Sequence, residues 1–325
     1  MSATTTQKRF GLPSGGAERA ATLRKYGAGV ALILLLVFSS LASDRFLQLQ
    51  NVLNVLRQIS IVGVLALGMT FVILTAGIDL SVGAVLSVVV VYTADMVQTQ
   101  GVFAGLVTAL AVGVFFGLIN GLGVTVGRVQ PFIMTLGMLA FAKGVALIFT
   151  EAQPIPITND TFLELGNGRT FGVPNPALVF LFLLALSMFV LRGTVFGRSV
   201  YAVGSNEEAA RLSGIPVLRV KCAVYMISGL MVGIAGILYA SQLGVGTAVA
   251  GDGKELDAIA ATVVGGTSLF GGIGTAGGTF IGAAILGVLS NILNLTGVSP
   301  YVQYLFRGGL IVAAVLLQRR DARGR

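Results

Sequence analysis

Long apolar runs separated by short polar segments follow one another along almost the whole chain. Most of these runs approach the roughly 20 residues that a helix needs to cross the hydrocarbon core of a membrane. The pattern therefore predicts an all-α polytopic membrane protein with about ten transmembrane helices. The runs cover residues 26–42, 59–76, 80–97, 102–127, 131–150, 176–192, 220–243, 256–271, 276–297 and 301–317.

The first run is short for a span, and Ser40-Leu41-Ala42 resembles the small-residue site at which a signal peptide is cleaved. The polar segment before it is long for a signal peptide, which favours a retained helix over a cleaved one. Residues 1–25 are then expected to form a cytoplasmic N-terminal tail. Residues 26–318 would form a single transmembrane domain, and residues 319–325 a cytoplasmic C-terminal tail.

Basic residues set the expected orientation. Most of the 21 Lys and Arg residues lie in three clusters, each beside a long apolar run. Because cytoplasmic loops carry such an excess, both termini and the loop at about 193–219 are predicted to be cytoplasmic. The net charge of +8 is thus a topology signal, and no nucleic-acid partner is expected. The clusters are Lys8, Arg9, Arg19, Arg24 and Lys25; Arg192, Arg198, Arg211, Arg219 and Lys221; and Arg319, Arg320, Arg323 and Arg325.

The composition narrows the functional classes. Of the 325 residues, 55% are hydrophobic and 10% charged, against about 25% charged in soluble domains, which argues against a soluble enzyme. With no histidine and the single cysteine Cys222, the chain offers no imidazole or thiolate metal cluster, no disulfide and no histidine base. No catalytic residue, metal site or cofactor is expected in this chain.

One carboxylate stands deep in the apolar sequence, in Gly77-Ile78-Asp79-Leu80-Ser81-Val82-Gly83. A charge at membrane depth costs several kcal/mol unless it is buried in protein or faces water. The flanking glycines and serine predict a broken helix, which is tolerated at this depth only around a cavity or in a packed interface. A translocation path or its gate is therefore predicted here, formed by Thr75, Gly77, Asp79, Ser81 and Gly83. As a gate or framework group Asp79 would bond to Ser81, Thr75 or free backbone amides; the alternative is direct contact with a solute.

Three asparagines, Asn120, Asn291 and Asn294, interrupt other apolar spans. Each either holds two helices together through its amide or offers that amide to a hydroxyl-rich solute. Both interpretations keep the amide away from lipid, and all three residues are candidates for the translocation path.

Glycines recur every four residues at Gly113, Gly117 and Gly121, and again at Gly229 and Gly233. This spacing predicts close packing of helix backbones, with a smooth pore wall as the alternative. A glycine-rich break at residues 265–278 also parallels the one at residues 75–83. Such paired interruptions can mark an internal repeat, and the sequence does not decide between a repeat and coincidence.

Residues 272–277 match the dinucleotide-binding pattern G-x-G-x-x-G, but they lie between two apolar runs. That pattern needs a strand before it and a helix N-terminus on the pyrophosphate. It is therefore interpreted as close packing or a helix break. The sequence contains no G-x-x-x-x-G-K-[ST] loop to hold a phosphate.

The predicted cytoplasmic loop contains a short helix with clear boundaries. Asn206 suits its N-cap, Glu207 and Glu208 favour its first turn, and Gly214 would end it. A two-turn helix between spans has the shape to dock into a groove on a partner. The candidate docking residues are Gly204, Asn206, Glu207, Ala210, Arg211 and Gly214.

Glu255 and Asp257 stand two residues apart at the start of another run. Their side chains point to different faces of a helix, which does not support a paired acid–base dyad. Their position favours an N-terminal helix cap or an outer vestibule.

These segments together resemble the membrane permease subunits of ribose-type sugar ABC importers, over about residues 46–317. Several long motifs occur in the order expected for that family. They are Gly68-Met69-Thr70-Phe71-Val72-Ile73-Leu74-Thr75-Ala76 running into Gly77–Gly83, Gly127-Arg128-Val129-Gln130-Pro131-Phe132-Ile133, residues 206–215, and Glu255-Leu256-Asp257-Ala258-Ile259-Ala260 followed by Gly265-Gly266-Thr267-Ser268.

The resemblance implies the ABC importer permease fold, with some helices broken or re-entrant, and ATP-driven import of a monosaccharide such as ribose across the cytoplasmic membrane. It implies a second permease subunit (identical or a close paralogue), a cytoplasmic ATPase that binds ATP and Mg²⁺, and an extracytoplasmic sugar-binding protein. On this view the 206–214 helix docks into the ATPase. The alternative is a gradient-driven secondary transporter of a small polar solute, for which Asp79 and Asp95 are the only acids well inside spans.

Overall fold

The structure is a computed structural model that describes residues 15–299, 301–303, 305, 308–309 and 312. This part of the chain is mainly helical, with four two-residue strands that pair antiparallel as β1 with β4 and β2 with β3. The elements are α1 (Gly15–Ala42), α2 (Leu49–Leu74), α3 (Val82–Gln100), α4 (Val102–Thr125), α5 (Pro131–Thr150), β1 (Ile155–Pro156), α6 (Asp160–Asn167), β2 (Arg169–Thr170), β3 (Val173–Pro174), α7 (Asn175–Gly193), α8 (Val195–Ser205), α9 (Glu207–Leu212), α10 (Val217–Leu243), β4 (Val245–Gly246), α11 (Lys254–Val264) and α12 (Ala276–Leu295).

Most of the apolar runs correspond to long helices, and the predicted all-α membrane fold is confirmed. Within the described residues seven helices are long and apolar enough to cross a membrane: α2, α3, α4, α5, α7, α10 and α12. The first run gives a shorter apolar helix, Gly27–Ala42, inside α1, and α1 itself begins at Gly15, within the expected tail. The last predicted run, residues 301–317, lies mostly outside the described residues, as do residues 1–14 and the expected C-terminal tail.

The run at 256–271 does not form a full-length spanning helix. Helix α11 has 11 residues, about 16 Å at 1.5 Å per residue, which is too short to cross the hydrocarbon core. Before it, the chain follows α3 as a non-helical segment. There a Cβ on Gly246 would lie 2.5 Å from the Ala94 Cβ, and the Gly251 N–H donates to Ser87 Oγ at 2.9 Å. Residues 244–264 are thus a re-entrant segment (residues 244–253) followed by a half-length helix.

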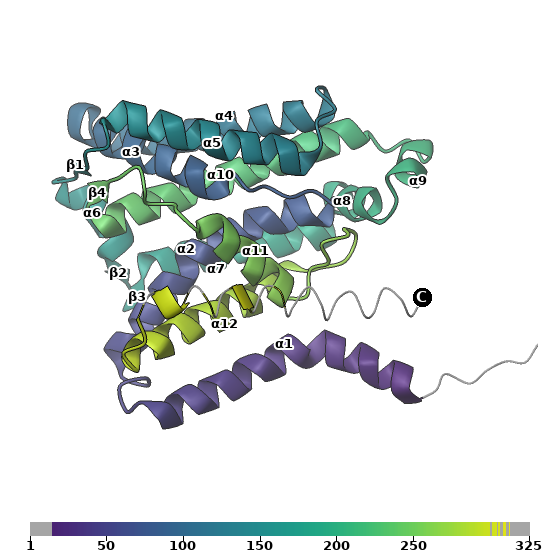
Figure 1. Ribbon diagram of the computed structural model, residues 1–325, viewed down its shortest axis with the longest axis horizontal. Coiled ribbons are helices and arrows are strands. Elements are labelled where there is room, and N and C mark those ends of the chain that lie inside the picture. The colour runs from purple at the N-terminus through teal and green to yellow at the C-terminus, as the bar shows by residue number, and fades with distance from the viewer. Residues whose placement is uncertain (1–14, 300, 304, 306–307, 310–311, 313–325) are drawn as a thin grey trace, which may run out of the picture.

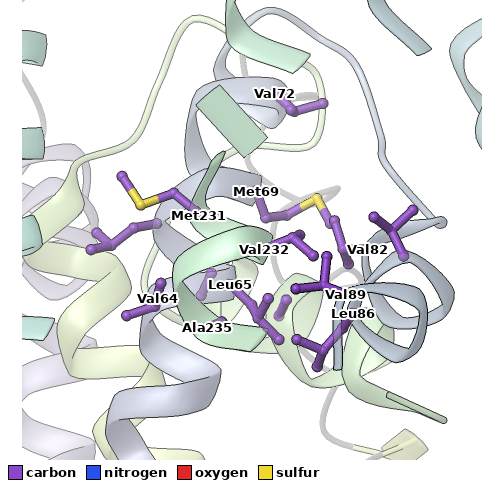
Figure 2. Packing of buried hydrophobic residues seen from close by; sticks show 14 of the residues in the cluster. Val64, Leu65, Met69, Val72, Val82, Leu86, Val89, Met231, Val232 and Ala235 are labelled. Carbon is purple, nitrogen blue, oxygen red and sulfur yellow. The ribbon is translucent and has the colours of Figure 1, made fainter. Parts of the chain in front are cut away.

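The core is formed where α2, α3 and α10 meet. Figure 2 shows Val64, Leu65, Met69 and Val72 from α2 beside Val82, Leu86 and Val89 from α3 and Met231, Val232 and Ala235 from α10. In its most apolar stretch, α2 is 78% buried, whereas α5 is only 22% buried. An apolar helix left this exposed fits a lipid environment and not water, so α5 forms part of the outer wall while α2 is central.

The glycine repeats bring α4 and α10 into backbone contact. A Cβ on Gly113 would meet the Gly229 carbonyl oxygen, and a Cβ on Gly121 would lie 3.0 Å from the Cys222 carbonyl oxygen. The predicted close packing of these helices is confirmed. Because the repeats face each other, they form a helix seam here and not a pore wall.

The two ends of the helix bundle differ. Helices α8 and α9 lie at one end, and α6 with strands β1 to β4 lies at the other (Figure 1). The start of α1 lies at the α8–α9 end. The spanning helices run between these two ends, which are called below the α8–α9 end and the α6 end.

Candidate functional site

The chain leaves the helical conformation between α2 and α3, at the predicted break. Helix α2 ends at Leu74, and α3 begins at Val82. The Thr75 hydroxyl donates to the Val72 carbonyl at 2.9 Å, and Ala76 has a left-handed φ of +59°. A Cβ on Gly77 would lie 2.8 Å from the Tyr225 hydroxyl, so a larger residue does not fit against α10.

Asp79 is almost completely buried, at 3% exposure. Its Oδ1 accepts from the Ser81 N–H at 3.1 Å and from the Ser81 hydroxyl at 2.6 Å. Its Oδ2 accepts from the Ser228 hydroxyl of α10 at 3.2 Å. The Asn120 Nδ2 of α4 donates to Ser81 Oγ at 2.8 Å and lies 3.5 Å from Asp79 Oδ1. The carboxylate thus has donors on both oxygens and ties the start of α3 to α4 and α10.

These contacts give the predicted gate residues of the α2–α3 break different roles. Asp79 bonds to Ser81, as a framework group would, whereas the Thr75 hydroxyl is directed to its own helix end. Gly83 packs against the re-entrant segment and not in the Asp79 network. A Cβ on Gly83 would lie 2.6 Å from the Gly251 carbonyl oxygen and would push the re-entrant segment away from α3. Ser228 was not predicted; its only signal is a hydroxyl next to Gly229 in an apolar span.

The three asparagines serve different contacts. Asn120 belongs to the Asp79 network, although its Oδ1 is buried without a hydrogen-bond partner. Asn291 of α12 and Asn51 of α2 exchange amide hydrogen bonds of 2.8 and 3.0 Å, so Asn291 joins two helices. The Asn294 Oδ1 accepts from Gln303 Nε2 at 2.7 Å, and Asn294 also lines a cavity.

That cavity lies between α2, α10, α11 and α12 and has a volume of about 430 Å³. It opens to the surface, since Gln58 and Asn294 are exposed, and more than half of its lining residues are polar. Gln242 Oε1 is buried there without a hydrogen-bond partner, and Lys254 Nζ lies 3.8 Å from Asp257 Oδ2. The polar lining consists of Gln58, Tyr239, Gln242, Lys254, Asp257, Ser290, Asn294 and Gln303. Of the predicted path residues, only Asn294 is among them.

The loop between α7 and α10 forms α8 and then the predicted short helix, α9. Asn206 Oδ1 accepts from the Ala209 N–H at 2.9 Å, as expected of an N-cap. Arg211 pairs with Glu207 at 3.3 Å, and Lys221 pairs with the same carboxylate at 2.5 Å. Leu212 is 81% exposed at the end of the helix. Helix α9 therefore presents an apolar tip and is held by ion pairs within the helix and to Lys221 of α10.

Helix α8 joins α9 to both glycine-rich breaks. The Tyr201 hydroxyl donates to the Gly274 carbonyl at 2.8 Å. Burial raises the pKa of the Tyr201 phenol, with the Arg192 charge opposing this effect, and the phenol remains a donor. The Gly272 N–H donates to the Leu74 carbonyl at 3.0 Å, and a Cβ on Gly204 would lie 2.7 Å from the Gly272 nitrogen.

These contacts form a junction at the α8–α9 end of the bundle, called below the α8 junction: Tyr201, Gly204, Leu74, Gly272 and Gly274. Gly272, within the G-x-G-x-x-G pattern, has a left-handed φ of +69° and would carry a Cβ only 2.5 Å from Ser205 Oγ. Its geometry is explained by close packing against α8, as the sequence predicted.

Comparison with known proteins identifies the family. Residues 51–315 match the family described as the branched-chain amino acid transport system / permease component. The chain belongs to this permease family. It is 43% identical over 304 residues to the ribose import permease protein RbsC of Bacillus subtilis, covering 92% of this chain and 94% of that protein. It is 42% identical to RbsC of Escherichia coli strain K12, covering 90% and 92%, and 35% identical to the xylose transport system permease protein XylH of the same strain, covering 90% and 91%.

The family match covers all the features described above. Residues 51–315 contain the Asp79 network, the polar cavity, α9 and the α8 junction. The permease assignment and the apolar spans together make the chain a multi-pass membrane protein with a role in transport. Sequence reasoning missed the cavity residues Gln58 and Gln242, which carry only a weak signal as amides near the ends of apolar runs. It noted Asp257 as a possible vestibule residue.

Proposed function

We propose that this chain is the membrane-spanning permease subunit of an ATP-driven ABC importer that carries a monosaccharide, ribose or a similar sugar, into the cell. The observation that carries the proposal is the identity of 41–43% to ribose import permeases over about nine-tenths of the chain. The polar cavity supports it, since amide and hydroxyl groups suit an uncharged polyol. The name of the wider family leaves an amino acid as the competing cargo, which the experiment below tests.

The proposed assembly has four components besides the sugar and the lipid. A second permease copy or a close paralogue completes the membrane part. A separate cytoplasmic ATPase binds ATP and Mg²⁺, and an extracytoplasmic binding protein delivers the sugar. In this arrangement the protein lies in the cytoplasmic membrane, with both termini and the α8–α9 end in the cytoplasm. The basic residues Arg192, Arg198 and Arg219 around α8 and α9 support that orientation.

In the proposed mechanism α9 docks into the ATPase and the α8 junction transmits its movement. A shift of α8 changes the contacts of Tyr201 with Gly274 and of Gly204 with Leu74, so it acts together on the segment before α12 and on the end of α2. Packed helices change between discrete arrangements and do not deform continuously. Two such arrangements would open the bundle alternately to the outside and to the cytoplasm.

Within this mechanism Asp79 is assigned to the gate or its framework. The bonds from Ser81 and Ser228 to the carboxylate support this role, because they connect α3 and α10, two helices of the core. Asn120, Asn291 and Asn294 are proposed to line the path or to position the helices that line it.

The experiment is reconstitution in vesicles with the ATPase and binding protein of the same system. We expect ribose or a related pentose to enter only when all components and ATP are present. Vesicles with the permease alone serve as the control. Uptake of a branched-chain amino acid in place of any monosaccharide would overturn the choice of cargo, and uptake by the permease alone would overturn the energy source.

A further inference from the structure

We propose that the cavity between α2, α10, α11 and α12 is the place where the sugar contacts this chain during transport, which rests on the proposed function. The ligand class is an uncharged monosaccharide, recognised through its hydroxyl groups. Gln58, Gln242, Lys254, Asp257 and Asn294 would form the contacts.

The first argument is the location of the polar groups. Gln58 lies within α2 and Gln242 near the end of α10, both candidate membrane spans. Polar side chains within spans are directed to the bundle interior or to a water-filled cavity, because lipid offers no hydrogen-bond partners. Both amides line the same cavity, although 184 positions of sequence separate them. The fold has therefore gathered polar groups from distant helices into one space.

The second argument is an unsatisfied acceptor. Gln242 Oε1 is buried without a hydrogen-bond partner, and such a group has a desolvation cost that a bound hydroxyl would remove. In the same lining, Lys254 Nζ lies 3.8 Å from Asp257 Oδ2 and 5.6 Å from the centre of the Tyr239 ring. The lysine supplies donors and the aspartate acceptors, so hydroxyl groups that both donate and accept can bond to either.

The third argument is charge and size. The opposite charges of Lys254 and Asp257 balance each other, so the lining favours an uncharged ligand over an acid or an amine. A volume of about 430 Å³ lies in the range of about 300–1,000 Å³ that is usual for small-molecule sites. Amides, a tyrosine and a balanced ion pair match a monosaccharide better than the apolar side chain of a branched-chain amino acid.

The fourth argument connects the cavity to the rest of the mechanism. Lys254 and Asp257 stand in the first turns of α11. The other end of α11 leads into residues 265–275, which contact α2 and α8 through Gly272 and Gly274. A movement of α8 would thus reach the cavity through residues 265–275 and the short helix α11. The contacts offered to the sugar would then change with the state of the ATPase.

Because Cys222 is the single cysteine, replacing it leaves an introduced cysteine as the only thiol that a reagent can label. In a Cys222→Ser background, Gln242→Cys is introduced, and the complete reconstituted transporter is treated with a membrane-impermeant thiol reagent. We expect labelling that slows when ribose and the binding protein are present during turnover. Phe171→Cys, at a 97% exposed position of the β2–β3 loop, is the control and should be labelled at the same rate with and without the sugar.

A kinetic measurement accompanies the labelling. Gln242→Leu removes one neutral hydrogen-bond partner, so the KM for ribose uptake should rise about 2- to 10-fold while ATPase docking stays unchanged. Gln58→Cys and Gln58→Leu on α2 repeat both tests if the Gln242 variants do not fold.

The outcomes separate this proposal from the one on which it rests. A wild-type transporter that takes up no monosaccharide overturns the proposed function. If the wild type transports ribose but the cavity cysteines are unlabelled, or are labelled at a rate that ribose does not change, the cavity is not the contact site. Protection by leucine and not by ribose would overturn the ligand class.

Discussion

Asp79 is a buried carboxylate that accepts hydrogen bonds from Ser81, just before α3, and from Ser228 of α10. The amide of Asn120 on α4 donates to Ser81 in turn. Replacement by alanine would leave the Ser81 N–H and the hydroxyls of Ser81 and Ser228 without their acceptor. Hydrogen bonds to a charged group contribute about 1.5–3 kcal/mol each, so the junction of α3 with α10 would loosen.

We therefore expect Asp79→Ala to lower sugar uptake strongly while the ATPase still binds. Uptake in vesicles and co-purification of the ATPase measure the two effects separately. Asp44→Ala, at an exposed acid before α2, is the matched control and should behave as wild type. Unchanged uptake in Asp79→Ala would remove this residue from the gate.

Gly113 tests the α4–α10 seam. A Cβ at this position meets the Gly229 carbonyl oxygen and lies 2.9 Å from the Gly233 nitrogen. Overpacking of this kind costs about 1–3 kcal/mol, which outweighs the gain of about 1 kcal/mol in helix propensity from glycine to alanine. We expect Gly113→Ala to lower the melting temperature in detergent. Gly137→Ala on α5, where a Cβ would meet nothing within 4 Å, should leave it equal or raise it.

At the scale of elements, α9 combines an exposed tip with a frame of ion pairs. Exchanging the charges of Glu207 and Arg211 would place an arginine beside Lys221, which now pairs with Glu207 at 2.5 Å. We expect Glu207→Arg with Arg211→Glu to uncouple ATP hydrolysis from uptake, because the helix would be turned or displaced. Leu212→Asp changes the 81% exposed tip and leaves the ion pairs in place, so it tests docking alone.

Both variants are read out as the ratio of ATP hydrolysed to sugar transported. If Leu212→Asp keeps normal coupling and normal ATPase binding, α9 is not the docking element. If only the charge exchange uncouples, the effect belongs to the fold of the loop and not to the contact with the ATPase.

The re-entrant segment is tied to α5 by an ion pair. Lys143 stands about 18 Å along α5 from Pro131, and its Nζ contacts Asp252 Oδ1 at 2.5 Å and the Ala248 carbonyl at 3.2 Å. Asp252→Ala would leave the ammonium group with one carbonyl partner. The Asp252 side chain is 57% exposed, so we expect Asp252→Ala to lower the free energy of unfolding by about 1–3 kcal/mol. This loss lies between the small contribution of a solvated ion pair and the cost of an unpaired charge in lipid.

Thermal unfolding of Asp252→Ala, Lys143→Ala and the double variant measures this pair by its non-additivity. The charge exchange Lys143→Asp with Asp252→Lys should restore part of the stability that each single change loses. If the loss in the double variant equals the sum of the two single losses, the two charges do not stabilise each other.

The elements that could be predicted are those with a local signal. The spans of α2, α3, α4, α5, α7, α10 and α12 follow from runs of apolar residues, and α9 follows from Asn206 and Gly214 at its ends. The resemblance implied re-entrant helices without placing them, and the half-length of α11 could not be predicted, because residues 256–271 read as one continuous apolar run. The cavity also escaped prediction, since Gln58 and Gln242 come together only through tertiary packing. Asn291 likewise gave no hint of Asn51, 240 positions away.

At the scale of the whole molecule, the alternation of the spans places unlike structures at the two ends. The α6 end carries the short strands and the polar connection of residues 151–174, and the α8–α9 end carries the basic loop. The cavity is lined near the end of α10 by Tyr239, Gln242 and Leu243, so it lies toward the α6 end. The α8 junction lies at the opposite end. On the proposed mechanism, a sugar arriving at the α6 end would thus meet the cavity before the α8 junction.

The cavity and the proposed ATPase-docking helix α9 lie toward opposite ends of the bundle, and this arrangement predicts how transport is powered. A gradient-driven carrier needs titratable or ion-binding groups along its path. Asp79 already has donors on both carboxylate oxygens, two from Ser81 and one from Ser228, and the cavity residues Lys254 and Asp257 pair with each other. We therefore expect uptake in cells to continue when an ionophore collapses the membrane gradients, provided that ATP is maintained, and to stop when ATP is depleted with the gradients intact. Vesicles loaded with ATP and treated with the same ionophore separate the two energy sources directly. Uptake that follows the gradient and ignores ATP would establish secondary transport instead, and Asp79→Asn would then be the first variant to examine, because it keeps the side-chain shape and removes the charge.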